Sequence, residues 1–314
     1  MLKKNIWNSL RKIRAGLYRI FLLELYAYRI VGPLLKRKLA HREDPIKYLF
    51  IISPMRSGST LLAHVLNGHP RIAGYGESHV PYLTERDLSH LIARTRIMEP
   101  SFSGSENFIL EKMVWNYEIS DKVLASADIY FVFLVREPAA TFRSMGKLAD
   151  QMPESPWARK WLSHDECLAY YQNRLNFMSR LMERINNSDR CLLLDFSALV
   201  NDTESALTAL QQFLDLDQPL SAEYPTTTRT GEFRYGDLSQ SIKSGKIQRR
   251  SDTPTTEASS PGVLEAKKIY AQALETSRQY CKFVIIDNAL REGFPRTNSA
   301  GKNPSHPLRQ QHLP

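Results

Sequence analysis

The sequence is short of cysteine and of long apolar stretches. Its 314 residues hold three cysteines, Cys167, Cys191 and Cys281, which are widely spaced and lack the spacing of metal ligands. This scarcity excludes a structural zinc site and fits a reducing compartment. Near the N-terminus, an uncharged run such as Ile30 to Leu35 falls far short of the roughly 20 apolar residues that cross a bilayer.

Acidic residues are nearly absent from the first 42 positions. Eleven Lys and Arg stand there against the single acid Glu24, which gives this segment a net charge of +10. Because the whole chain carries +9, the remainder carries 9 minus 10, or −1. We therefore expect no basic groove across the folded body and no nucleic-acid partner.

Apolar residues recur within this basic segment at three- and four-residue spacing, which predicts an amphipathic helix over residues 1–44. They are Ile6, Leu10, Ile13, Leu17 and Ile20 or Phe21. Two interpretations stay open: the helix lies on an anionic membrane surface, or it packs on the domain with a solvated charged face. A secretory signal peptide is less favoured, because no small-residue cleavage site follows a clean apolar core. We expect a cytoplasmic protein, peripheral to a membrane under the first interpretation; a Golgi-type location stays open for a eukaryotic source.

Short apolar strands alternate with helices through the middle of the chain. Strands are expected at 48–52, 108–116, 129–135 and 191–196, and helices at 60–67, 84–98, 165–184, 203–214 and 263–280, with a helix also starting after Pro138 and a short strand or helix extension at CKFVII. This alternation predicts an α/β domain over residues 45–294, with a parallel sheet covered by helices on both faces. Residues 218–262 predict a long loop, and residues 295–314 a disordered tail.

The first strand leads into PMRSGST, a loop of phosphate-binding type that lacks the usual lysine. In a nucleoside-triphosphate P-loop, a lysine follows the last glycine and a Ser or Thr next to it binds the metal. Here Gly58 is followed by Ser59 and Thr60, and the cation is Arg56. The backbone N–H groups and hydroxyls from Ser57 onward suit a phosphate at a helix N-terminus.

A second anion site is predicted at the end of the strand at 129–135. Arg136 follows this strand directly, and Ser144 lies eight residues on in the next helix. Ligands of parallel α/β sheets bind at the carboxyl ends of the strands. Two separate anion sites predict a ligand with two separated phosphates.

PMRSGSTLL and VREPAATFRS together resemble the pair of signatures of sulfotransferases that use 3′-phosphoadenosine 5′-phosphosulfate (PAPS). The resemblance extends over Tyr48 to Ile247 through GYGES, LEKMVWN, LLLDFSALVNDTESAL and GDLSQSIKSGKI. It implies a three-layer, P-loop NTPase-like sulfotransferase fold, PAPS as sulfuryl donor and no required metal. With arginine in this loop, the sequence is more similar to the tyrosylprotein and carbohydrate sulfotransferases than to the cytosolic small-molecule type, which has lysine there.

The same resemblance implies roles for individual residues. The 5′-phosphosulfate would be bound by Arg56, Ser57, Gly58, Ser59 and Thr60, and the 3′-phosphate by Arg136 and Ser144. Ser239, Gly245 and Lys246 resemble a late loop that closes over PAPS, although the tryptophan often found around that loop is absent.

Three residues are implied as catalytic. Glu77, seven residues after Pro70, resembles the general base, and His79 is the alternative base. Lys112 resembles the lysine of an Asp-Lys motif in which Glu111 replaces the aspartate, and with Arg56 it would neutralise charge on the transferring group. The alternatives are a surface or capping glutamate and a helix-surface lysine.

These residues predict transfer of a sulfuryl group to a hydroxyl acceptor. The basic helix favours a carbohydrate or lipid-linked glycan acceptor, while a tyrosine or another small hydroxylated metabolite stays open. Trp157 and Trp161 either line an acceptor pocket or pack as a helix stripe. Two alternative functions stay open. One is a P-loop nucleotide kinase or NTPase, although this sequence lacks the lysine after Gly58 and a Walker B aspartate. The other is a non-catalytic membrane-surface protein.

Overall fold

The computed structural model describes residues 25–74, 76–99, 101–226, 230–231, 237, 240–249 and 260–287. Three sequence predictions lie outside these residues: the apolar stripe of the first 24 positions, Ser239, and the tail at 295–314.

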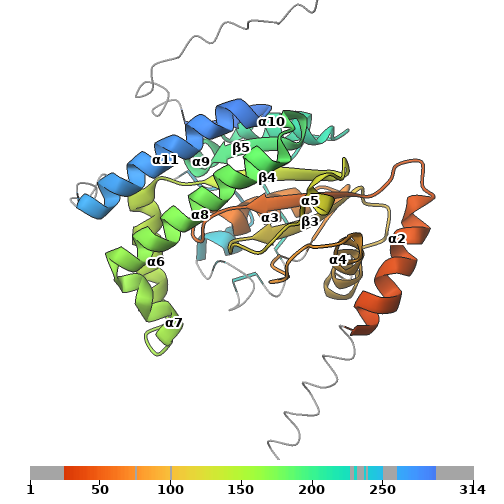
Figure 1. The fold of residues 1–314 in the computed structure, drawn as a ribbon, viewed down its shortest axis with the longest axis horizontal. Helices are drawn as coiled ribbons and strands as arrows, with labels where there is room; N and C mark the ends of the chain where they lie inside the picture. The colour runs from red at the N-terminus through yellow and green to blue at the C-terminus, as the bar shows by residue number, and fades with distance from the viewer. Residues whose placement is uncertain are drawn as a thin grey trace, which may run out of the picture.

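A six-stranded parallel sheet forms the middle of the molecule (Figure 1), which confirms the predicted fold class. Its order is β2-β3-β1-β4-β5-β6, and every neighbouring pair is parallel. Helices connect the strands, as parallel pairing requires. The strands are β1 Lys47–Ile52, β2 Ile72–Ala73, β3 Phe108–Met113, β4 Ile129–Val135, β5 Cys191–Asp195 and β6 Phe283–Ile285.

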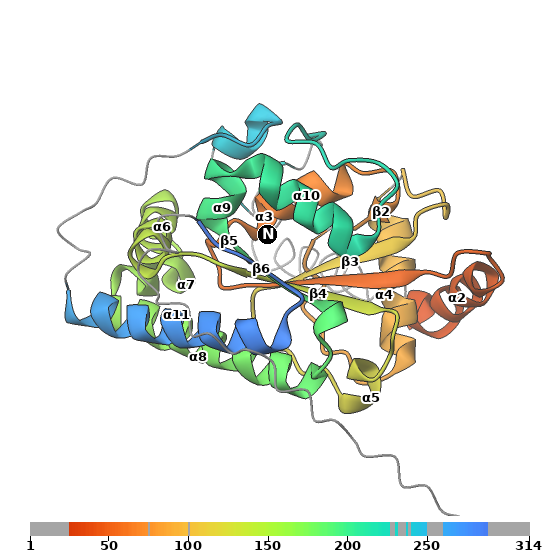
Figure 2. The same cartoon turned by 90° about the horizontal axis from the view of Figure 1, so that it is seen from above.

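Helices cover both faces of this sheet (Figure 2). One face carries α4 Glu85–Met98, α6 Pro138–Gln151, α8 His164–Ile185 and α11 Pro261–Tyr280; the other carries α3 Ser59–Asn67, α9 Phe196–Asn201 and α10 Thr203–Leu214. The shorter helices and turns are η1 Ala27–Val31, α2 Gly32–Ala40, α5 Asp121–Leu124, α7 Pro156–Arg159, η2 Lys160–Leu162, η3 Ser188–Arg190 and η4 Gln240–Ser244.

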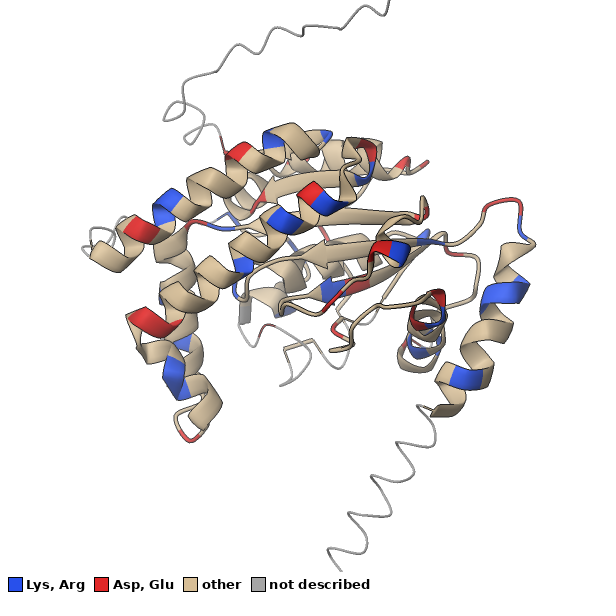
Figure 3. Ribbon diagram, viewed as in Figure 1, with Lys and Arg blue, Asp and Glu red and all other residues tan. Residues whose placement is uncertain are grey.

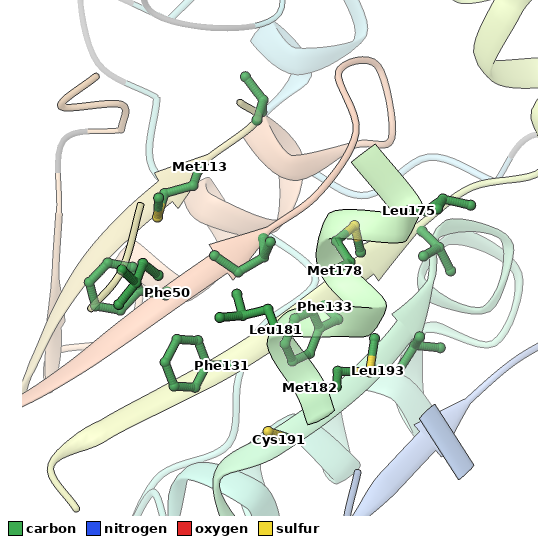
Figure 4. Close-up of a cluster of buried hydrophobic side chains, with 14 of the residues drawn as sticks. Phe50, Met113, Phe131, Phe133, Leu175, Met178, Leu181, Met182, Cys191 and Leu193 are labelled. Atoms are coloured by element: carbon green, nitrogen blue, oxygen red, sulfur yellow. The ribbon is translucent and has the colours of Figure 1, made fainter. Parts of the chain in front are cut away.

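Two apolar cores lie on the two sides of the sheet because strand side chains alternate between its faces. Along β1, Phe50 and Ile52 enter the core beneath α8 and α11, while Leu49 and Ile51 enter the core beneath α3 and α10. Figure 4 shows Met178 and Met182 of α8 against the aromatic and aliphatic side chains of β4 and β5. The strands read as continuous apolar runs because both faces are buried.

Most predicted elements are confirmed within one or two residues, and the differences lie where strands end. The expected strand at 108–116 stops at Met113, and the expected strand at 191–196 stops at Asp195. The Asp195 side chain accepts the Ser197 N–H and starts α9, a helix that the sequence prediction missed. β2 lies in a stretch predicted as loop, and η4 lies inside the predicted loop at 218–262.

The described end of the basic N-terminal segment, η1 and α2, packs against α4. A Cβ at Gly32 would lie 2.5 Å from the Ser89 carbonyl oxygen, so the backbones of α2 and α4 touch. The opposite side of this segment exposes Tyr26, Ile30 and Leu34, and Figure 3 shows Lys and Arg along α2. Among the described residues, no helix is long and apolar enough to span a membrane.

Candidate nucleotide-binding and transfer site

The loop between β1 and α3 has a conformation that selects its residues. Gly58 has a φ of 89°, and a Cβ there would lie 2.2 Å from the Phe196 ring. Arg56 also has a positive φ, 63°, which is uncommon for a residue with a side chain and occurs often at functional sites. The Ser57 hydroxyl is buried and has no hydrogen-bond partner among the described residues. The loop therefore holds a buried donor suited to a bound anion.

Arg174 and Tyr170 of α8 anchor this loop, and the sequence prediction missed both. The fully buried Arg174 guanidinium donates to the Ser53 carbonyl (2.9 Å), the Met113 carbonyl and the Trp115 carbonyl (2.8 Å). Burial lowers its pKa to about 10, which still leaves a cation near neutral pH. Arg174 thus ties the carboxyl ends of β1 and β3 together.

Tyr170 acts beside it on the loop itself. Its hydroxyl accepts the Met55 N–H at 2.8 Å and donates to the Val114 carbonyl at 2.6 Å. The only sequence signal was the aromatic and leucine spacing of the helix at 165–184, which indicates packing and carries no information on the polar ends of these side chains.

The two predicted anion sites line one and the same cleft. Arg56 Nε donates to Ser144 Oγ at 3.1 Å, and Arg136 donates to the Arg56 carbonyl at 3.1 Å. The Arg136 guanidinium also lies over the Phe196 ring, 4.5 Å from its centroid. Because β1 and β4 are adjacent, the residues following them meet at one edge of the sheet.

The late loop closes the far side of this cleft. Lys246 lines it together with Tyr224, Ile242 and Gln248. Gly245 has a φ of 69°, and its carbonyl accepts the Tyr224 N–H at 2.8 Å. Asp237 reaches in from the same region, and its carboxylate lies 2.9 Å from the Arg56 guanidinium.

Lys112 joins this cleft to the predicted general base. Its buried ammonium lies 3.2 Å from Thr60 Oγ1, at the start of α3, and 2.9 Å from Glu77 Oε1. The other Glu77 oxygen lies 3.5 Å from the ring of His79, whose Nδ1 lies 3.4 Å from the Tyr117 hydroxyl. The structure thus brings the proposed base and the proposed charge-neutralising lysine together at the start of α3.

The contacts of Arg56 differ from those of Lys112. Its guanidinium contacts Ser144 and Asp237, so in this conformation it lies with the residues assigned to the 3′-phosphate. A part in stabilising the transferring group stays a prediction for Arg56.

Glu111 lies next to Lys112 and is wholly buried. Its Oε1 accepts the Ser78 N–H at 2.9 Å and the Ser78 hydroxyl at 2.7 Å. Its Oε2 is buried without a hydrogen-bond partner among the described residues. Burial raises the pKa of Glu111 to about 8, so the carboxyl is mainly neutral at pH 7.

Aromatic side chains follow one another from the loop after β3 to α7. Trp115 and Trp161 each pack edge-on against Tyr170, with ring centroids 5.3 Å apart in both pairs. Trp161 is buried, whereas Trp157 is 40% exposed and packs against Trp161. The Lys160 ammonium lies 4.3 Å from the Trp161 ring centroid. Trp161 is therefore a packing residue, and Trp157 is the one open to solvent.

Among the described residues, no group of three or more His, Cys, Asp or Glu side chains is arranged to hold a metal ion. The site offers instead cations and hydroxyl donors: Arg56, Ser57, Thr60, Arg136, Ser144 and Lys246. Such donors fit the phosphate groups of a nucleotide.

A model of the sulfotransferase family matches residues 98–220. The matched segment contains Lys112, Arg136 and Ser144, and it runs from the end of α4 through β5 and α10. No curated protein matches the sequence.

Three of the solved structures that this chain is similar to are named as sulfotransferases. The sulfotransferase domain from the curacin biosynthetic pathway is 18% identical, with a TM-score of 0.43, and the match covers 73% of this chain and 97% of that one. The sulfotransferase from Alicyclobacillus acidocaldarius is 13% identical, with a TM-score of 0.36 and coverages of 58% and 87%. Mouse sulfotransferase SULT7A1 complexed with PAP is 13% identical, with a TM-score of 0.43 and coverages of 82% and 91%.

Proposed function

We propose that this chain transfers a sulfuryl group from PAPS to a hydroxyl acceptor, in keeping with the match of residues 98–220 to a model of the sulfotransferase family. The observation that carries this proposal is the position of Lys112, between Thr60 of the phosphate-type loop and Glu77. A cation there reaches both the leaving phosphate and the carboxylate that deprotonates the acceptor.

The donor binds through the cleft residues. The loop from Ser57 to Thr60 and the N-terminus of α3 hold the 5′ end with N–H groups and hydroxyls. Arg136 and Ser144 hold the 3′-phosphate, and Lys246 closes over the nucleotide with Gly245. The contact between Arg56 and Ser144 supports a single bound molecule that spans both parts of the cleft.

The transfer needs one proton acceptor and one source of positive charge. The Glu77 carboxylate takes the proton of the acceptor hydroxyl, whose oxygen forms a bond to sulfur while the bond from sulfur to the 5′-phosphate oxygen breaks. Lys112 and Arg56 stabilise the charge that develops on the leaving phosphate. The products are a sulfate ester and 3′,5′-diphosphoadenosine.

The kinase alternative has less support from the same residues. The position after Gly58 holds Ser59, whose side chain is short and neutral, and Arg56 points to Ser144 and Asp237. A transferring sulfuryl group carries less negative charge than a phosphoryl group, so cations and backbone donors suffice without Mg²⁺.

For the acceptor, we propose a carbohydrate or lipid-linked glycan. The proposed base lies beside His79 and Tyr117, and Trp115 precedes Tyr117 in the loop after β3. Aromatic faces next to polar groups suit ring-shaped acceptors that carry hydroxyls. Peripheral contact with an anionic membrane is proposed through the exposed Tyr26, Ile30 and Leu34 and the neighbouring cations of α2.

Calorimetric titration with 3′,5′-diphosphoadenosine and with ATP, each with and without Mg²⁺, tests this function. We expect tight binding of 3′,5′-diphosphoadenosine without metal, and loss of that binding in Arg136→Ala. Binding of ATP alone, and only with Mg²⁺, would support the kinase alternative. An acceptor screen with labelled PAPS then tests glycans against tyrosine peptides and small alcohols.

A further inference from the structure

We propose that the buried carboxyl group of Glu111 positions the general base Glu77 through its two hydrogen bonds to the neighbouring Ser78. This inference rests on the proposed function, because it concerns the orientation of the proposed base. Glu111 does not line the nucleotide cleft and is not itself a catalytic residue.

The segment carrying Glu77 runs alongside β3 and is held there by consecutive residues of that strand. The Lys112 N–H donates to the Gly76 carbonyl at 3.0 Å, and the Lys112 ammonium lies 2.9 Å from Glu77. The next residue, Ser78, is held by Glu111 through both its N–H and its hydroxyl. Glu77 therefore lies between two anchored positions, and its direction depends on both anchors.

Ser78 receives further contacts that complete this anchor. Its hydroxyl lies 2.9 Å from the Tyr82 hydroxyl, and its carbonyl accepts a hydrogen bond from Arg94 of α4 at 2.9 Å. Every polar atom of Ser78 is thus engaged by surrounding elements, and Glu111 provides two of the four contacts. Loss of Glu111 would leave the Ser78 N–H buried without this acceptor, which weakens the anchor.

The groups around Glu111 decide what its ionisation would do. The two hydrogen bonds from Ser78 and, more weakly, the charge of Arg94 in α4 favour the charged form. Glu77 of the adjacent loop opposes it, and Tyr117 faces it from the loop after β3. Burial outweighs these influences and brings the pKa to about 8. Above that pH, a second carboxylate would form next to Glu77, and the repulsion would disturb the turn that carries the base.

The test compares the pH profile of sulfuryl transfer in the wild type and in Glu111→Gln. The amide oxygen can accept both hydrogen bonds from Ser78, and the amide nitrogen replaces an oxygen that has no hydrogen-bond partner in the described part of the chain. We expect kcat within about twofold of wild type at pH 7. Only about one tenth of Glu111 is protonated one pH unit above its pKa. At pH 9 we therefore expect kcat of Glu111→Gln to be about tenfold higher than kcat of the wild type.

Glu106→Gln is the matched control. Glu106 is also buried beside β3, and its carboxylate accepts hydrogen bonds from Ser103 and Gly104, away from Glu77. We expect kcat of this variant to fall at alkaline pH as it does in the wild type. In Glu111→Ala, kcat should fall at least about tenfold while the affinity for 3′,5′-diphosphoadenosine stays unchanged, a division that general unfolding would not produce.

The outcomes separate this inference from the proposed function. In one outcome, the wild type binds 3′,5′-diphosphoadenosine and transfers the sulfuryl group, while kcat falls at alkaline pH in both the wild type and Glu111→Gln. That result overturns only the role of Glu111. Wild type that neither binds this nucleotide nor transfers the sulfuryl group overturns the function, and with it the positioning role. If the fall of kcat at alkaline pH disappears in Glu111→Gln but remains in Glu106→Gln, the result supports both the positioning role of Glu111 and the proposed function.

Discussion

The Asp237 carboxylate forms an ion pair with the Arg56 guanidinium, with Oδ1 and the nearer nitrogen 2.9 Å apart. Both side chains line the nucleotide cleft, and both are mostly buried. An anionic ligand that contacts Arg56 therefore competes with a carboxylate of the chain itself.

Replacement of this carboxylate should tighten nucleotide binding. In Asp237→Asn, Arg56 loses its charged partner, and we expect about three- to tenfold stronger binding of 3′,5′-diphosphoadenosine at low salt, since charge-assisted contacts are the stronger kind. Calorimetry measures the change. Asp217→Asn is the control, because Asp217 is exposed and lies 3.9 Å from Arg71 outside the cleft. Weaker binding in Asp237→Asn would mean that the carboxylate assists the ligand.

Removal of the Arg174 side chain should destabilise the fold. Arg174→Met leaves the carbonyls of Ser53, Met113 and Trp115 without their buried donor. We expect a loss of about 3 kcal/mol or more in the free energy of unfolding, measured by urea denaturation. On the same helix, Arg184 forms an exposed pair with Asp121 and donates one hydrogen bond to a backbone carbonyl, that of Ile119, so Arg184→Met should cost less than Arg174→Met. Equal losses in the two variants would contradict the anchoring role.

A methyl group at Gly58 should weaken nucleotide binding. Gly58→Ala requires a side chain at a φ of 89° and 2.2 Å from the Phe196 ring, so the loop must move. We expect at least about tenfold weaker binding of 3′,5′-diphosphoadenosine. Gly146→Ala is the control: a Cβ there meets nothing within 4 Å in α6, and it should raise stability by about 0.4–1 kcal/mol without affecting binding.

The stability of the protein should depend on pH through Glu111. The pKa of Glu111 lies near 8 in the folded chain against an ordinary value of 4.5, so between these values the folded state holds a proton that the unfolded state has lost. Stability from this group is therefore fully present below about pH 4.5 and is lost as pH rises through about 8. We expect the difference in unfolding free energy between Glu111→Gln and wild type to grow across this window, by an amount on the order of a few kcal/mol. Urea denaturation at pH 5, 7 and 9 measures it, and a constant difference would contradict it.

Much of the fold follows from local sequence patterns. The strand at 129–135 and the helix at 203–214 have the predicted bounds, because apolar runs and turn residues act within a few positions of the chain. The short strand at Ile72–Ala73 escaped prediction, since two residues give no periodicity and its pairing with Phe108 and Ile109 is a tertiary event.

The sequence by itself determined the parallel sheet, the loop from Arg56 to Thr60 and the presence of cations at two strand ends, because backbone geometry and side-chain periodicity are local. The order of the strands decided the rest. With β1 between β3 and β4, Lys112 meets Thr60 from one side, and Arg136 meets Arg56 from the other. The raised pKa of Glu111 likewise comes from burial among distant segments, a property that no single stretch of sequence contains.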